Sequence, residues 1–128
     1  MAYLHYRLSV FTPYNTPETN PVEGVLFLDR VSLDRVDIEF PFRCAGLAHC
    51  KITMNAKQII PWNMTEWVSG DGRVISIPIQ SDPIQPPYEF KAICYNEDDT
   101  FNHTVYIDVY VKEVDTQLFN QAINGSVL

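Results

Sequence analysis

The sequence predicts an all-β domain, an antiparallel two-sheet β-sandwich of seven or eight strands. Apolar residues recur at every second position in a series of short segments, which is the period of a half-buried strand and not of a helix. Clusters of Pro, Gly, Asn and Asp separate these segments, as turns do in sandwiches. Periodicity leaves the strand order open between an immunoglobulin-like sandwich and a jelly roll.

The first expected strand covers 4–10, where Leu4, Tyr6, Leu8 and Val10 share one face. Residues 12–21 contain three prolines and no periodicity, which predicts a surface loop of about ten residues. Further strands are expected at 24–28, 35–40, 47–54, 58–60, 73–79, 88–95 and 104–111.

A chain of 128 residues has room for one hydrophobic core, so residues 1–112 are expected to form a single sandwich domain. The pattern changes in 113–128, which predicts a C-terminal helix or tail with an apolar stripe that includes Leu118, Phe119 and Ile123. A single short helix is marginal alone, so it should dock on its own domain or on a neighbouring copy. These three residues are therefore interface candidates.

Charge excludes several partners. The formal net charge is -7 and the sequence contains no cluster of Lys or Arg that could bind phosphates, which argues against nucleic acid as a partner. No apolar run approaches the length of a membrane span, so no membrane insertion is expected. The first ten residues lack the pattern of a signal peptide, although Asn-X-Ser/Thr triplets at Asn63, Asn102 and Asn124 keep an extracellular protein open as an alternative.

The acidic stretch at residues 96–102 is the main candidate for a metal site. Asn96, Asp98 and Asp99 carry the oxygen ligands that calcium prefers, but the stretch has no glycine for a sharp bend. It lies between two patterned strands, where Asn and Asp favour chain reversal, so a polar hairpin loop is the default interpretation. We expect no metal and no cofactor, with a calcium-dependent carbohydrate-binding module that uses this loop and Trp67 as an alternative.

No enzymatic activity is expected. The sequence contains no HExxH, no GxSxG and no glycine-rich phosphate loop, and His5, His49 and His103 are scattered. Aromatic residues are the better functional candidates, because they offer large contact areas at low entropic cost. Tyr14 lies in the long loop, Trp67 lies between strands, and Tyr106 and Tyr110 share the outward face of the last strand.

Cys50 and Cys94 fall on the inward faces of separate strands, with Trp62 between them in the sequence. This spacing resembles the Cys, Trp, Cys skeleton of immunoglobulin domains, which implies a Cys50–Cys94 disulfide joining the sheets and a buried Trp62. Ala92 stands where that family has a tyrosine. Without a signal peptide, free buried thiols are favoured, and a Cys44–Cys50 bridge is a further alternative.

A second resemblance covers roughly residues 3 to 112. The runs "IEFPFRCAGLAH", "IIPWN", "GDGR", "PPYEFKA" and "YNEDDTFNHTV" are similar to a pattern in small all-β accessory and decoration proteins of phages and other microbial viruses. This resemblance implies a non-enzymatic virion component, a capsid decoration or adaptor protein, that forms a homo-oligomer such as a trimer and contacts other structural proteins such as a capsid. The alternatives are an extracellular immunoglobulin-like recognition module and the calcium-dependent carbohydrate binder.

Overall fold

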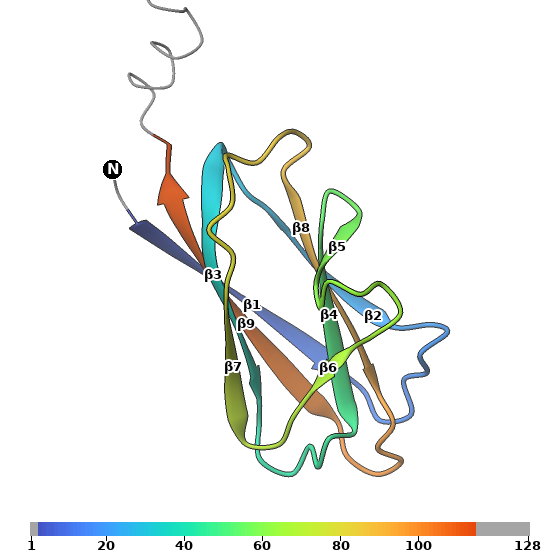
Figure 1. Ribbon diagram of the computed structural model, residues 1–128. Coiled ribbons are helices and arrows are strands. Elements are labelled where there is room, and N and C mark those ends of the chain that lie inside the picture. Colours follow the sequence, from blue (N-terminus) through green and yellow to red (C-terminus); the bar gives the residue numbers. More distant parts are fainter. Residues whose placement is uncertain (1–2, 115–128) are drawn as a thin grey trace, which may run out of the picture.

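The computed structural model describes residues 3–114, which form nine β-strands in two antiparallel sheets without any helix (Figure 1). The strands are β1 (Tyr3–Thr12), β2 (Val22–Phe27), β3 (Val31–Phe40), β4 (Ala48–Met54), β5 (Lys57–Ile60), β6 (Val68–Ser69), β7 (Arg73–Pro78), β8 (Glu89–Asn96) and β9 (His103–Glu113). Within this part of the chain no helix is long and apolar enough to cross a membrane.

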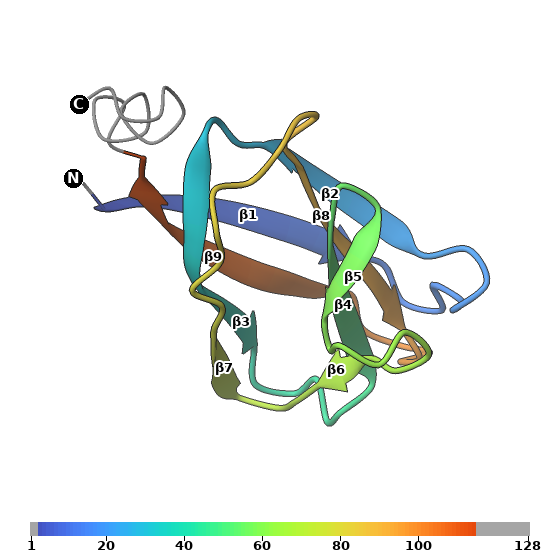
Figure 2. The same ribbon diagram turned by 45° about the horizontal axis from the view of Figure 1, so that its top comes forward.

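The strand pairs are nested along the chain. β1 pairs with β9, β2 with β8, β3 with β7, and β4 with β5. Successive pairs alternate between the two sheets, which gives the order β1-β9-β3-β7 in one sheet, called sheet A, and β2-β8-β4-β5 in the other, called sheet B. The short strand β6 joins sheet B beside β4. Figure 2 shows the two sheets facing each other across the interior.

The sheets approach each other closely where β1 of sheet A runs beside β2 of sheet B. A Cβ added to Gly24 on β2 would lie 2.9 Å from Val10 Cγ2 and 3.3 Å from the methyl groups of Leu8. Glycine is thus the residue that lets the two strands pack at this corner, because real Cβ contacts are not so short.

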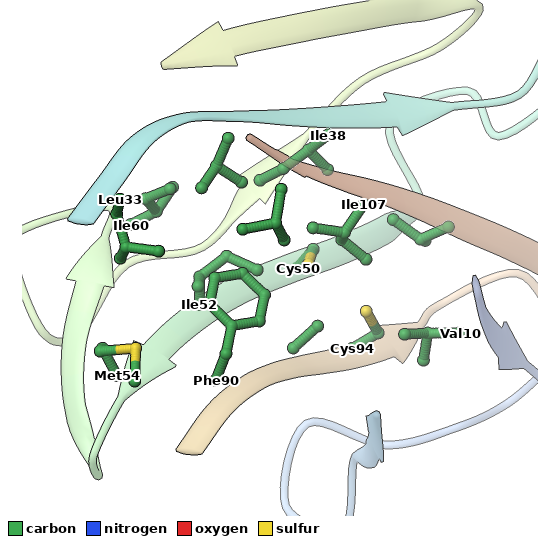
Figure 3. Close-up of a cluster of buried hydrophobic side chains, with 14 of the residues drawn as sticks. Val10, Leu33, Ile38, Cys50, Ile52, Met54, Ile60, Phe90, Cys94 and Ile107 are labelled. Carbon is green, nitrogen blue, oxygen red and sulfur yellow. The ribbon is translucent and has the colours of Figure 1, made fainter. Parts of the chain in front are cut away.

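The core lies between the sheets and is built from alternate residues of both (Figure 3). The expected inward residues of β3 and β9 are confirmed, since Val36, Ile38, Phe40, Val105, Ile107, Val109 and Val111 are fully buried. Phe90 reaches from β8 toward sheet A and is also fully buried. One-sided burial of this kind is what fixes strand register, because a slip of one residue would turn these side chains to solvent.

Several expectations need correction. The strands number nine, because the prediction missed β6, which is only two residues long. Residues 115–128, with Leu118, Phe119 and Ile123, lie outside the described residues, and the predicted C-terminal helix has no support. Strand β9 extends to Glu113, one residue past the expected end of the sandwich.

The immunoglobulin-type skeleton is wrong. Cys50 and Cys94 are register partners on the neighbouring strands β4 and β8, so both belong to sheet B and cannot join the two sheets. All three cysteines are buried and free. Trp62 is 68% exposed on the segment after β5 and takes no part in the core. Its ring instead lies beneath the Lys57 ammonium, 4.8 Å from the ring centre.

Candidate functional site

Three loops meet at one end of the sandwich, at the bottom of Figure 1: residues 13–21, 41–47 and 97–102. We call this region the loop end. Backbone hydrogen bonds tie the loops together, from Asn15 N to Asp98 O at 2.8 Å and from Glu97 N to Leu47 O at 2.8 Å. Asn96 N also donates to Thr16 O at 3.0 Å. The loop end is therefore a connected platform and not three independent loops.

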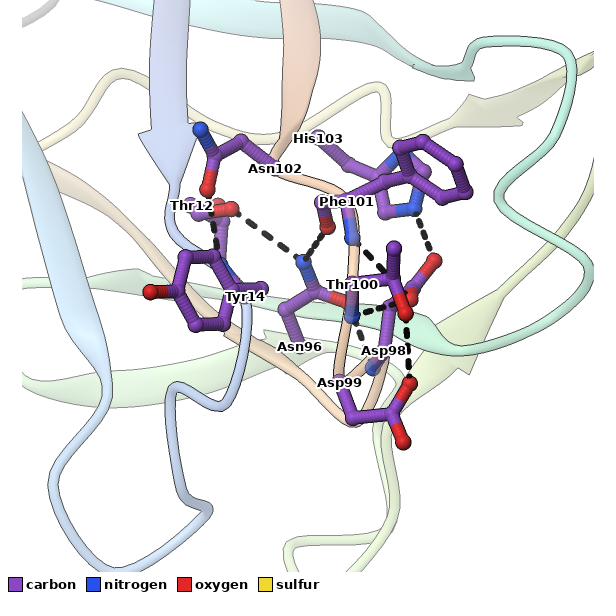
Figure 4. A network of polar contacts seen from close by, with 9 residues as sticks. All are labelled: Thr12, Tyr14, Asn96, Asp98, Asp99, Thr100, Phe101, Asn102 and His103. Atoms are coloured by element: carbon purple, nitrogen blue, oxygen red, sulfur yellow. Dashed lines mark hydrogen bonds and ion pairs between the residues drawn. The ribbon is translucent and has the colours of Figure 1, made fainter.

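Asn96, the last residue of β8, is the centre of this platform (Figure 4). Its side chain is fully buried, and its amide nitrogen donates to the carbonyls of Thr12, at 3.2 Å, and Phe101, at 3.0 Å. Its carbonyl oxygen accepts a 3.0 Å bond from Asp98 N. One side chain thereby holds the end of β1 and both limbs of the β8–β9 loop, as buried amides do when all their groups are paired.

Asp98 closes the turn next to it. Its Oδ1 accepts bonds from Thr100 N at 2.9 Å and Phe101 N at 3.1 Å, and its Oδ2 lies 2.9 Å from His103 Nε2. The hydrogen bond from His103 is the main reason that the pKa of Asp98 lies below its usual value, and the Thr100 amide adds to the effect. Since both Asp98 oxygens accept, His103 must carry its proton on Nε2.

The acidic stretch is thus an internally bonded turn. Both oxygens of Asp98 are engaged, and Asp99 Oδ1 accepts a 2.8 Å bond from the Thr100 hydroxyl. Residues 3–114 contain no group of three or more His, Cys, Asp or Glu arranged to hold a metal ion. The expected hairpin is wrong in one respect, because β8 and β9 belong to different sheets and the turn crosses between them. His103 is the first residue of β9 and is buried.

Two open depressions flank the Asn96–Asp98–His103 network. The first, called the aromatic depression, has a volume of about 280 Å³ and is lined by Pro41, Phe42, Arg43, Phe101, Asn102, His103, Thr104 and Tyr106. Phe42 is 82% exposed and Phe101 is 57% exposed. The ring of Phe42 lies over Gly72, where an added Cβ would come within 2.6 Å of it. The aromatic depression therefore presents large apolar rings that the molecule itself leaves uncovered.

The second, called the acidic depression, has a volume of about 300 Å³ and is lined by Asn15, Thr16, Pro17, Glu18, Tyr95, Asn96 and Glu97. The Tyr95 ring stacks on His49 at 4.4 Å between ring centres and meets the edge of Trp67 at 4.6 Å. Burial raises the pKa of Tyr95, and the negative charges of Glu18 and Glu97 raise it further. Asn96 lines this depression and His103 lines the other, so the buried network forms the wall between them.

The structure separates the predicted interface residues. Tyr106 lines the aromatic depression. Tyr14 is exposed in the loop of residues 13–21, and its backbone amide donates a 3.0 Å hydrogen bond to Asn102 Oδ1. Trp67 lies next to the acidic depression, because its indole N–H donates a 3.1 Å hydrogen bond to the carboxylate of Glu18, which lines that depression. Tyr110 lies four residues further along β9, on the outer face of sheet A.

The outer face of sheet A pairs its own groups. The guanidinium of Arg7 lies 4.6 Å from the ring centre of Tyr106, and that of Arg35 lies 4.2 Å from Tyr110. Asp108 forms an ion pair with Arg7 at 3.4 Å, and its Oδ1 lies within hydrogen-bond distance of His5 Nε2, at 2.9 Å. Tyr106 and Tyr110 are therefore packed under cations of their own chain, which argues against a bare aromatic row on this face.

Sequence reasoning missed Phe42, Phe101, Arg43 and Glu18. The only signal in the sequence was two apolar rings placed outside any alternating segment, Phe42 within "FPFRC" and Phe101 within the polar turn. A scan against models of protein families found none that matches the chain, and a search of curated proteins found no similar sequence. No residue role is carried over from a relative.

Proposed function

We propose that this protein is a non-enzymatic assembly protein that acts through protein–protein contacts at its loop end, as a virion component of the capsid-decoration or adaptor type. The aromatic depression is the observation that carries the proposal. Copies of the chain associate through it into a symmetric oligomer, and the rest of the loop end contacts another structural protein.

Phe42 and Phe101 supply the reason for association. Large aromatic rings are strongly favoured at the centres of interfaces, and covering one exposed phenylalanine contributes about 2 kcal/mol at about 25 cal/mol per Å² of apolar area. Arg43, beside both rings, belongs to the residue types enriched in interfaces. The platform beneath them is already held by hydrogen bonds, so little ordering entropy opposes the contact.

The nested strand order also supports the proposal of a virion assembly protein. A ribbon of antiparallel pairs folded so that successive pairs alternate between two sheets is the plan of a jelly roll, and we infer that fold here. Jelly rolls are frequent among viral capsid proteins, but lectins and cupins share them, so the fold sets a direction and not a function.

The alternatives have weaker support in the geometry. An immunoglobulin-like module loses its disulfide framework, because Cys50 and Cys94 lie in one sheet. A calcium-dependent sugar site would need free oxygens from Asp98 and a bare face on Trp67. Asp98 is fully engaged, and the Lys51 ammonium covers the Trp67 ring at 4.3 Å from its centre.

Light scattering coupled to size-exclusion chromatography tests the proposal on the full chain. We expect an oligomer for the natural sequence at tens of micromolar and a monomer for the Phe42→Ser, Phe101→Ser double variant. Phe27→Ser is the matched control, because Phe27 is 67% exposed and lies on β2 at the far end of the sandwich. A monomeric natural protein, or an oligomer that survives the double substitution, would show that this surface does not assemble.

A further inference from the structure

The loop of residues 61–66, between β5 and β6, presents two large apolar side chains to solvent. Trp62 is 68% exposed and Met64 is 73% exposed. The Lys57 ammonium lies 4.8 Å from the centre of the Trp62 ring, and most of the indole is nevertheless uncovered. Tryptophan is among the residue types that most often anchor an interface, so this loop offers a second apolar contact surface beside the aromatic depression.

The shape of the 61–66 loop is fixed from within by Gln58. This side chain is buried, and its amide nitrogen donates to the carbonyls of Pro61 at 2.8 Å, Asn63 at 3.2 Å and Glu66 at 3.4 Å. A backbone bond of 3.1 Å from Glu66 N to Asn63 O closes the turn. Because the loop is already ordered, its two exposed apolar side chains can enter a contact at a small cost in entropy.

The aromatic depression is a complementary surface for these side chains. It is open, has a volume of about 280 Å³ and is lined by the exposed rings of Phe42 and Phe101, which is the size and chemistry suited to one large apolar side chain. None of its lining residues belongs to the 61–66 loop, and Figure 1 shows that loop at the side of sheet B, apart from the loop end. A copy therefore does not fill its own depression.

Charges favour the loop of a second copy as the occupant. The lining of the depression includes Arg43 and no Asp or Glu, whereas the 61–66 loop includes Glu66 and no Lys or Arg. Within residues 3–114, neither the Arg43 guanidinium nor the Glu66 carboxylate has a hydrogen-bond or ion-pair partner. An ion pair at the rim of an interface mainly fixes the orientation of the partners, and these two groups are available to form one.

We propose that the 61–66 loop of one copy inserts Trp62 and Met64 into the aromatic depression of the next copy. Such a contact joins two different surfaces, so it can repeat from copy to copy and close into a ring, whereas a contact between two depressions would end at a dimer. This inference deepens the proposed function and rests on it for the aromatic depression as the surface of assembly.

Mixing two variants of the full chain tests the contact. The Phe42→Ser, Phe101→Ser variant, called the depression variant, keeps the loop, and the Trp62→Ser, Met64→Ser variant, called the loop variant, keeps the depression. Each should be monomeric alone in light scattering at tens of micromolar, since each lacks one side of the contact and should lose at least about thirtyfold in affinity. An equimolar mixture should form a one-to-one dimer, because the loop of the first still fits the depression of the second.

NMR detects the same contact when it is weak. The loop variant is labelled with ¹⁵N and titrated with the unlabelled depression variant. We expect saturable shifts of the Phe42, Phe101 and His103 amides, which belong to the lining of the depression. An unlabelled chain with all four substitutions is the matched control and should produce no shifts, because it has no apolar side chains to insert.

Reversing the two charges tests the orientation. In the otherwise natural chain, Arg43→Glu and Glu66→Arg should each weaken assembly about fivefold, because each places like charges together at the rim. Both substitutions in one chain should restore it, because the pair is re-formed with its signs exchanged. Phe27→Ser on β2 remains the control for loss of an exposed ring elsewhere and should leave assembly unchanged.

Two results would overturn the inference alone: a loop variant that assembles as the natural protein does while the depression variant is monomeric, or a mixture of the two variants that gives no shifts. Either would leave the depression as an assembly surface with a different occupant. A natural protein that is monomeric at tens of micromolar would overturn the proposed function and this inference together, so the two failures are distinguishable.

Discussion

Replacing Asn96 by alanine should destabilise the protein strongly although the residue lies at the end of a strand. The substitution removes the two bonds that its amide donates to Thr12 O and Phe101 O and the one that it accepts from Asp98 N. The backbone bond from Asn96 N to Thr16 O remains, because alanine keeps its amide. The change therefore isolates the side chain.

The magnitude follows from what each partner loses. Thr12 is fully buried and Asp98 is nearly so, so the Thr12 carbonyl and the Asp98 amide are left unpaired at a cost of about 1 to 1.5 kcal/mol each. Phe101 is mostly exposed, so water can reach its carbonyl and the cost there is about 0.5 kcal/mol. The free energy of unfolding should fall by about 3 kcal/mol, a large part of the stability of a small domain.

Urea denaturation followed by fluorescence measures this change, with the slope of the transition expected to stay constant. Asn102→Ala is the matched control in the same turn, because that exposed side chain accepts a single bond from Tyr14 N and should contribute less than about 1 kcal/mol. A loss below about 1 kcal/mol for Asn96→Ala, or equal losses for both variants, would refute the idea that this amide holds the loops together.

Two further predictions concern titratable groups. The pKa of Asp98 lies below the usual 3.8, so this carboxylate stabilises the native state fully above that pH and progressively less as the pH falls through its native pKa. The urea midpoint should therefore fall less steeply between about pH 5 and 2 for Asp98→Asn than for the natural protein. Parallel curves of urea midpoint against pH would contradict this. Burial raises the pKa of Cys44 to about 11, with help from the charges of Asp71 and Asp98, and the hydrogen bond with Cys94 and burial raise that of Cys50. Because all three thiols are also buried, a chromogenic thiol reagent at pH 8 should find no reactive thiol in the native protein and three in urea, whereas one thiol in urea would mean a disulfide.

The alternating strand pattern predicted most of the fold. In β4 every second residue is apolar and buried, and the same holds for Val36 to Phe40 of β3, Phe90 to Cys94 of β8 and Val105 to Val111 of β9, because a strand between two layers can present only one face to the core. Strand order could not be read in the same way. Alternation shows which residues of a strand face the core, but it does not show which strands are hydrogen-bonded neighbours. The alternation of β8 looks the same whether its neighbour is β9 or β2.

The candidate site was only partly visible. Its turn was predicted from the Asn and Asp at 96–99, whose side chains bond to nearby backbone groups over two or three residues. The two depressions combine residues from loops far apart in the chain, as with Glu18 beside Glu97 and Phe42 beside Phe101. The prediction that Trp62 is buried was wrong for a related reason, because an aromatic residue outside an alternating segment gives no indication of which way it faces.

The nesting of strand pairs has a consequence for how the chain folds. Of the four nested pairs, only β4 and β5 are joined by a short turn, and each pair outside them must close a longer segment, until Tyr3 on β1 meets Lys112 on β9. Loop-closure entropy grows only logarithmically, by about 0.6 kcal/mol for each doubling of length, so the outermost pair costs little more at equilibrium than the pairs inside it. Rate is more sensitive than stability to such separations, and folding that is slow for the size of the protein is the price of this topology.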